Sequence, residues 1–158
     1  MQRVICLGSP QGADALAWRL GDALEARIAQ SPASTGVEIV RCASPAHLPG
    51  LLGGLQAVLI LDAVTQLPAG TARVLAPEEI EDAPAWSSHG MGLVTALELA
   101  RALGDHPPQV TILGLGTGSP DADVEALTAV LFPAVWRVLA EQASTSPPPG
   151  RPSRTGPA

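Results

Sequence analysis

Short apolar segments alternate with amphipathic segments along most of the chain. Apolar runs rich in Val, Ile and Leu, bounded by Gly, Pro or acidic residues, predict strands over residues 3–8, 36–40, 57–62 and 109–115. Segments in which apolar residues recur every three or four positions predict helices over residues 15–28, 45–55, 89–103 and 121–141. The repeated order of strand and helix predicts an α/β fold.

A further strand is predicted over residues 71–76. The connection that leads to it from Asp62 is too short for a full crossover helix, which favours an antiparallel strand at an edge. The remaining connections suit right-handed crossovers between parallel strands. We therefore expect a three-layer α/β sandwich with a mainly parallel, twisted sheet of about five strands and helices on both faces.

The length of 158 residues fits one domain with a single buried core. The apolar periodicity ends near residue 142, and the rest consists mainly of Ser, Thr, Pro, Gly and Arg. Such a composition cannot bury enough apolar surface to fold. We expect one domain over residues 1–142 and a disordered tail over residues 143–158.

Composition and charge exclude several classes of partner. The net charge is −6, and the 9 basic residues are all arginines scattered along the chain, so no basic stripe can follow a phosphate backbone. No apolar run approaches the ~20 residues that a membrane span requires. The first apolar run is also too short for a signal peptide. We expect a cytoplasmic protein that binds neither nucleic acid nor a membrane.

Cys6 and Cys42 both fall in or beside predicted strands. The sequence has no CxxC motif and no Cys–His pair with the spacing of a metal site. We therefore expect two buried, reduced thiols.

Two carboxylates and one imidazole form the strongest candidate site. Asp62 ends an apolar strand, where burying a carboxylate is costly without a partner or a metal. Asp14 lies near the end of the first glycine-rich loop, and His89 opens a predicted helix. A central strand order of 2-1-3 would bring Asp14 and Asp62 to the same carboxyl edge of the sheet. Spacing alone does not place His89 there, but together the three side chains can hold a divalent metal with open positions.

Each member of this set has an ordinary structural alternative. Asp62 can be a turn residue at the edge of the sheet. Asp14 can be the N-cap of the first helix, and His89 can be a surface histidine.

Other motifs carry weaker signals. Gly114–Gly118 follows a strand and resembles a phosphate cradle, but it fits neither the dinucleotide nor the P-loop pattern, so a tight turn at the floor of a pocket is preferred. Ser9 lacks the GxSxG context of a nucleophile. His47 and His106 lie beside prolines and are expected at the surface.

Four segments, Leu7–Ala17, Leu59–Val64, Thr71–Glu79 and Ser87–Leu93, resemble motifs of a known family, the [NiFe]-hydrogenase maturation endopeptidases. The segment Leu7–Ala17 is similar to their opening LGxGNxLxxDDGxG loop, and Leu59–Val64 resembles their strand with an acid near its end. The segment Thr71–Glu79 matches their short strand followed by two acids, and Ser87–Leu93 matches their S-x-H-x-x-GL helix start. The similarity covers about residues 3–141.

The resemblance implies that Asp14, Asp62 and His89 contact a metal. Members of this family remove a short C-terminal peptide from the precursor of the hydrogenase large subunit after nickel has been inserted. The resemblance therefore implies a nickel-dependent peptidase whose partner is that precursor, and whose nickel is supplied by the substrate. A metal can polarise the scissile carbonyl or acidify a bound water while a carboxylate accepts the proton.

The sequence departs from the family pattern in two loops. The opening loop is shorter, with Ser9-Pro10 in place of Gly-Asn and Ala13 in place of the first of two acids, and Arg41–Ser44 replaces a loop that often reads Asp-Gly-Gly-Thr. The altered first loop leaves open a non-catalytic relative that binds the nickel-loaded precursor as a chaperone. A nucleotide-binding module that uses Gly114–Gly118 is a further alternative.

Overall fold

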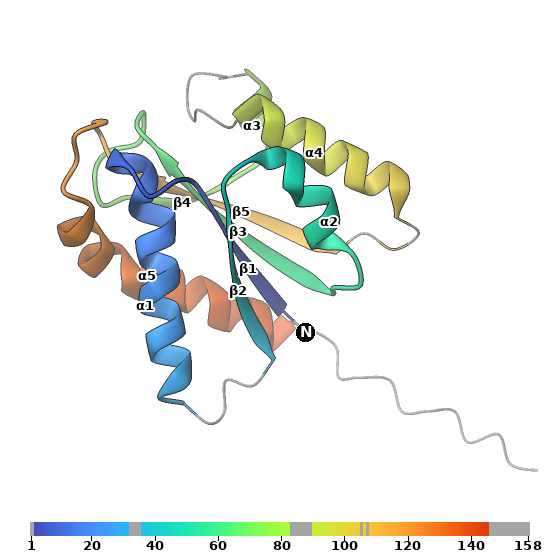
Figure 1. The fold of residues 1–158 in the computed structure, drawn as a ribbon, viewed down its shortest axis with the longest axis horizontal. Coiled ribbons are helices and arrows are strands. Elements are labelled where there is room, and N and C mark those ends of the chain that lie inside the picture. The colour runs from blue at the N-terminus through green and yellow to red at the C-terminus, as the bar shows by residue number, and fades with distance from the viewer. Residues whose placement is uncertain (1, 32–35, 83–89, 105, 107, 146–158) are drawn as a thin grey trace, which may run out of the picture.

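The computed structural model describes residues 2–31, 36–82, 90–104, 106 and 108–145. Its strands form one five-stranded sheet in the order β2-β1-β3-β5-β4 (Figure 1). Their bounds are Gln2–Leu7 (β1), Val37–Cys42 (β2), Ala57–Val64 (β3), Ala72–Leu75 (β4) and Gln109–Gly116 (β5). Strand β4 is antiparallel to β5, and the other three pairings are parallel. The predicted mainly parallel sheet with an antiparallel edge strand is confirmed.

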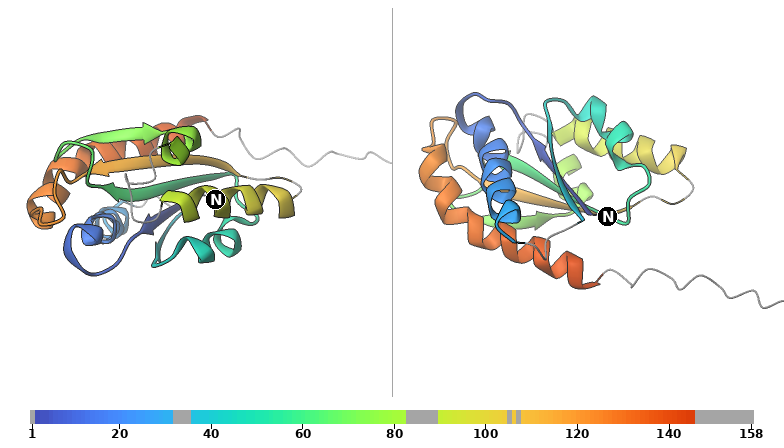
Figure 2. Two further views of the ribbon diagram at one scale, coloured as in Figure 1. Left: turned by 90° about the horizontal axis from the view of Figure 1, so that it is seen from above. Right: turned by 60° about the horizontal axis from the view of Figure 1, so that its bottom comes forward.

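Helices cover both faces of the sheet, which confirms the predicted layers (Figures 1 and 2). Helices α1 (Leu16–Ala29) and α5 (Val124–Thr145) lie on one face. The other face carries α2 (Leu48–Leu52), α3 (Pro77–Asp82) and α4 (Gly90–Leu103). Two short 3-10 helices, η1 (Gly12–Ala15) and η2 (Pro45–His47), lead into α1 and α2. No helix within the described residues is both long and apolar enough to cross a membrane.

The central strands are buried on both faces, which explains their continuous apolar sequences. Side chains of a strand alternate between the two faces, so each strand contributes to two separate core clusters. In β3, Val58 and Ile60 pack against α2 and α4, whereas Leu59 and Leu61 pack against α1 and α5. The same three strands, β1, β3 and β5, therefore pack against both layers of helices.

Several element bounds differ from those predicted. Strand β3 continues for two residues beyond Asp62, because Val64 still pairs with Gly116 of β5, so the prediction that Asp62 ends its strand is wrong. The helix predicted over residues 45–55 is divided into η2 and a five-residue α2, since prolines and glycines interrupt it. Helix α3 was not predicted, because six residues are too few to show a helical period.

Helix α5 begins at Val124 rather than at residue 121. Asp123 lies just before it, and its Oδ1 accepts a hydrogen bond from the Ala126 N–H at 3.1 Å, as a helix N-cap does. The helix then continues through Thr145, beyond the predicted domain end at residue 142. Residues 146–158 lie outside the described residues, so the nature of the tail stays a prediction.

The glycine-rich segment Gly114–Gly118 makes room for another part of the chain. A Cβ at Gly116 would lie 2.0 Å from the Pro68 carbonyl oxygen, because the loop before β4 crosses β5 there. The backbone N–H groups of residues 116–118 donate to carbonyls of that loop and of β3, those of Thr71, Val64 and Leu67. These donors are occupied, so the phosphate-cradle interpretation of this segment is wrong.

Both cysteines are buried and free, as predicted. Cys6 lies in the core beneath α1, and burial raises the pKa of its thiol to about 12. Burial also raises the pKa of the Cys42 thiol. Both groups are therefore held in their neutral form in the folded protein.

The buried thiols predict an alkaline loss of stability. In the unfolded chain a cysteine loses its proton near its ordinary pKa, whereas folded Cys6 keeps its proton up to about pH 12. The unfolded state binds fewer protons in this range, so the free energy of unfolding should fall by about 1.4 kcal/mol per pH unit for this thiol. The chain has no Lys and no Tyr, and the buried Cys42 thiol is common to the wild type and to a Cys6 variant, so the difference between the two reports on Cys6. Urea titrations between pH 9 and pH 11 should show a shallower decline for Cys6→Ala; parallel declines would contradict the prediction.

The glycines of β5 predict a graded response to substitution. Gly116→Ala places a Cβ against the backbone of Pro68, whereas a Cβ at Gly114 meets the flexible ends of Leu67 and Leu75. We expect Gly116→Ala to lower the free energy of unfolding by about 1–3 kcal/mol, and Gly114→Ala to lower it less. Gly50→Ala is the control, because nothing lies within 4 Å of its added Cβ. Equal midpoints of urea unfolding for the first two variants would contradict this ranking.

Candidate active site

Asp62 occupies a buried position in the middle of the sheet. It lies in β3, pairs with Leu7 of β1 and Gly114 of β5, and is 2% exposed. The alternation of β3 side chains places it on the face covered by α2, α3 and α4, together with Ile60 and Val64. A turn residue at the edge of the sheet, the structural alternative, is therefore excluded.

Asp14 lies in η1, directly after the loop that follows β1. The loop is closed by a hydrogen bond from the Ser9 N–H to the Asp14 carbonyl at 3.3 Å. It is tied to the β5–α5 connection by another, from the Ala13 N–H to the Pro120 carbonyl, also at 3.3 Å. Asp14 is not the N-cap of α1: Ala15 holds that position, and no side chain caps the helix. The N-cap interpretation of Asp14 is therefore wrong.

Gly8 is the residue that allows Asp14 to approach the sheet. A Cβ at Gly8 would lie 2.2 Å from the Asp14 carbonyl oxygen and 3.6 Å from its Oδ1. Only a glycine leaves enough space for this contact. In the sequence, a glycine directly after a buried strand is a signal of such a close backbone approach.

The topology brings both carboxylates to the same end of β1. Asp62 is the neighbour of Leu7, the last residue of that strand, and Asp14 rests on the next residue, Gly8. The predicted adjacency of the first and third strands is thus confirmed.

His89 falls outside the described residues, so its place relative to the two acids stays a prediction. Helix α4 begins at the following residue, Gly90, on the face of the sheet toward which Asp62 is oriented. Within the described part of the chain, no three His, Cys, Asp or Glu side chains are grouped so as to hold a metal ion. The predicted triad needs His89, and this finding does not bear on it.

Apolar side chains occupy the position beside Asp62 on β5. Its neighbour there is Gly114, and a Cβ at that glycine would lie 2.8 Å from Leu75 Cδ1 and 3.2 Å from Leu67 Cδ1. The two leucines fill the space that a larger residue would take. Electrostatic interactions of the Asp62 carboxylate are strengthened in such surroundings, because little water screens them.

On the other side of β1, the same row of the sheet ends with Cys42. This residue pairs with Leu7, and its thiol donates to the Ser44 carbonyl at 3.0 Å. The side chain of Arg41, one residue earlier, forms ion pairs with Asp22 and Glu25 of α1. These acids raise the pKa of Arg41, and the ion pairs hold this arginine against α1.

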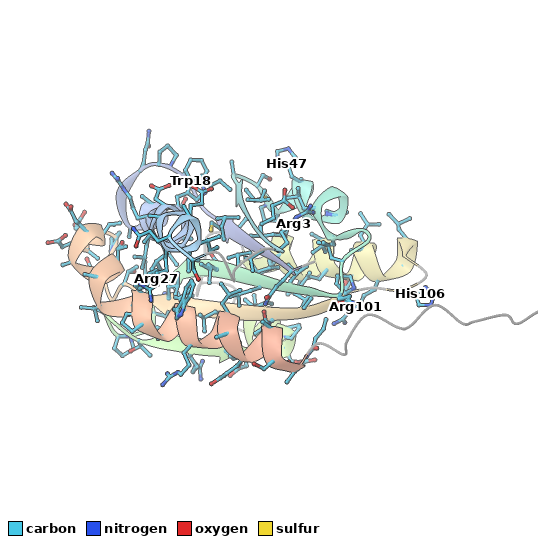
Figure 3. All side chains as sticks on the ribbon, turned by 90° about the horizontal axis from the view of Figure 1, so that it is seen from below. Arg3, Trp18, Arg27, His47, Arg101 and His106 are labelled. Carbon is cyan, nitrogen blue, oxygen red and sulfur yellow. The ribbon has the colours of Figure 1, made fainter. Side chains whose placement is uncertain are left out.

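The remaining candidates have structural roles or lie at the surface. Ser9 Oγ accepts a hydrogen bond from the Gln11 N–H at 3.3 Å, which stabilises the turn after β1. His47 and His106 are exposed, as predicted (Figure 3).

Comparisons with known proteins agree with this fold. The family model of the hydrogenase maturation proteases (HycI) matches residues 19–139. The hydrogenase maturating endopeptidase HybD from E. coli is 26% identical, with a TM-score of 0.65 over 89% of this chain and 93% of that chain. An endopeptidase from Escherichia coli, solved in solution, is 24% identical, with a TM-score of 0.67 over 91% and 99% of the two chains.

An archaeal structure has the same fold. The [NiFe] hydrogenase maturation protease HybD from Thermococcus kodakarensis is 19% identical, with a TM-score of 0.65 over 87% of this chain and 97% of that chain. A search of curated proteins gives no match. Because the family model spans most of the chain, the protein belongs to the hydrogenase maturation protease family, a family of peptidases.

Proposed function

We propose that this protein is a nickel-dependent endopeptidase that removes the C-terminal extension from the large-subunit precursor of a [NiFe]-hydrogenase. The observation that carries the proposal is the approach of Asp14 and Asp62 to the same end of β1, in a chain that belongs to the hydrogenase maturation proteases. The E. coli protein that is 26% identical is itself a hydrogenase maturating endopeptidase, which supports the assignment of this activity.

In this proposal nickel arrives as part of the substrate, and Asp14, Asp62 and His89 contact it. Carboxylate and imidazole ligands suit a divalent ion such as nickel, and such an ion supplies polarisation of the scissile carbonyl or of a water molecule. A precursor without nickel would leave the three side chains without the group they recognise. Cleavage would then follow metal insertion, which explains the order of the two maturation steps.

The two acids have different roles in the proposed reaction. Asp62 is fixed in the sheet and surrounded by apolar side chains, so it is suited to accept the proton of the attacking water. Asp14 lies on η1, which is closed by backbone hydrogen bonds, and it orients the metal-bearing end of the substrate. His89 supplies the third contact from the segment before α4.

A second candidate function is a non-catalytic relative that only binds the nickel-loaded precursor. It is favoured by Ala13, which stands where the family resemblance implies an additional acid. Ala13 is a buried residue of η1 and is 6% exposed. An acid at this position would have to be buried or would change the loop. The two candidates differ in whether the precursor loses mass.

The proposed function is tested by incubating the protein with nickel-loaded and nickel-free precursor and measuring precursor mass by mass spectrometry. We expect cleavage of the loaded form only. Asp62→Asn, which keeps the volume of the buried side chain, should lower the cleavage rate by about 100-fold or more, as loss of a general base does. Cleavage of both forms, cleavage of neither, or an Asp62→Asn variant as fast as the wild type would contradict the proposal. Stable binding of the loaded precursor without cleavage would favour the non-catalytic relative.

Gly8 should act as a positioning residue for Asp14. Gly8→Ala forces the Asp14 backbone to move away from β1, because the new Cβ would overlap its carbonyl oxygen. A displacement of this size should lower kcat/KM for cleavage by roughly 100-fold. Gly50→Ala is the matched control, because nothing lies within 4 Å of the added Cβ. Similar kcat/KM values for the two folded variants would show that Gly8 does not position the acid.

A further inference from the structure

On the face of the sheet toward which Asp62 is oriented, α4 lies beside α2 (Figure 1). Residues of α4 and of the η2–α2 segment line a groove there. It consists of a cavity of about 500 Å³ near Ser44 and Gly92 and a smaller one of about 150 Å³ near Leu103 and Pro108. Pro49 lines both cavities, so they adjoin. We call them together the α2–α4 groove.

Small residues on α4 form the floor of this groove. They recur at every fourth position and therefore share one side of the helix, Gly92, Ala96 and Ala100, and Gly104, the residue after the helix, continues the row. A Cβ at Gly92 would lie 3.3 Å from Pro45, so η2 approaches the helix closely at this end. Larger side chains on α4 would fill the groove, and their absence from this side leaves it open.

Large apolar side chains stand at the rim instead. Leu99 is 49% exposed and Leu103 is 73% exposed. A partner that covered these two side chains would remove apolar surface from water. They lie one helical turn apart, so they form a continuous apolar strip along α4. Exposed apolar surface of this kind marks a site of protein interaction.

The described residues that line the groove include no Asp, Glu, Lys or Arg, in a protein whose net charge is −6. His106 is the only titratable side chain that borders the two cavities among the described residues. A charged segment would lose its hydration here without gaining a partner. The lining therefore matches an uncharged, apolar segment.

The position of the groove relates it to the proposed active site. One end of the groove is lined by Ser44, two residues beyond Cys42. Cys42 lies in the row of the sheet that also contains Leu7 and Asp62. Cys42 and Asp62 are two strands apart, or roughly 10 Å. A peptidase of this family acts on a protein, so the surface next to the carboxyl edge faces the substrate during cleavage.

We propose that the α2–α4 groove binds an apolar segment of the hydrogenase precursor at a distance from the cleaved bond. The proposal rests on the proposed function, since it assigns a docking surface to the same substrate. Helix α4 has 14 residues and is therefore about 21 Å long, enough to hold roughly six residues of an extended segment. Binding there orients the precursor so that its extension reaches Asp62.

Steady-state cleavage of the nickel-loaded precursor tests this inference. Leu99→Glu places a charge at the exposed rim, and we expect it to raise KM roughly tenfold while kcat changes less than twofold. Val130→Glu is the matched control, because Val130 is 63% exposed on α5, which covers the opposite face. Circular dichroism and thermal unfolding confirm that both variants are folded. Equal KM values for the two variants would overturn the inference and leave the proposed function intact.

A binding measurement separates failure of this inference from failure of the proposed function. Calorimetric titration of the loaded precursor into proteins that carry Asp62→Asn measures binding without cleavage. We expect the additional Leu99→Glu change to weaken binding roughly tenfold, and Val130→Glu to have no effect. This comparison remains decisive even if the wild type cleaves nothing, and absence of binding by the wild type would overturn both proposals.

Two other occupants of the groove are distinguished by the Leu99→Glu variant and by a truncated chain. A wild-type dimer that Leu99→Glu converts to a monomer, with KM unchanged, would assign the groove to a second copy of the chain. A lower KM after removal of residues 146–158 would assign it to the protein's own C-terminal segment. Either result would overturn the proposal.

Discussion

Backbone hydrogen bonds between β1 and β3 place Asp62 beside the end of β1, at the carboxyl edge of the sheet. Because Leu7 pairs with Asp62, the buried carboxylate lies beside the last residue of β1, where the loop that carries Asp14 begins. A shift of one residue in this pairing would move Asp62 to the face covered by α1 and α5. The apolar residues on both faces of β1 and β3 prevent that shift, since each would move from its own core cluster to the other.

The order of strands and helices was largely predictable from the sequence, because each central strand is a continuous apolar run and each long helix has a regular period. The antiparallel direction of β4 followed from the short connection after β3. Predictions failed where interactions between distant segments decide the outcome. Strand β3 extends past Asp62 because β5 continues alongside it, and no feature near Asp62 indicates this. Helix α3 is too short for its period to be visible.

The candidate site shows the same division between local and distant information. The position of both acids at the same end of β1 followed from topology, whereas the role of His89 came from the family resemblance and stays a prediction. The apolar surroundings of Asp62 depend on Leu67 and Leu75, which reach Gly114 from a loop and a strand elsewhere in the chain. In the sequence, the glycines at positions 8, 114 and 116 are typical of turns. In the structure, each one leaves space for a segment from another part of the fold.

The sheet contains no pair of strands joined by a tight hairpin. Each pairing brings together segments separated by at least one helix, and β4 pairs with β5 only after α3 and α4 have been traversed. Such a topology has a high contact order, so a large loss of chain entropy precedes the first stabilising hydrogen bonds, which slows folding. During synthesis, β4 emerges before the strand with which it pairs. Strand β4 therefore stays unpaired until β5 has been synthesised, and the sheet is completed only when the last third of the chain is available.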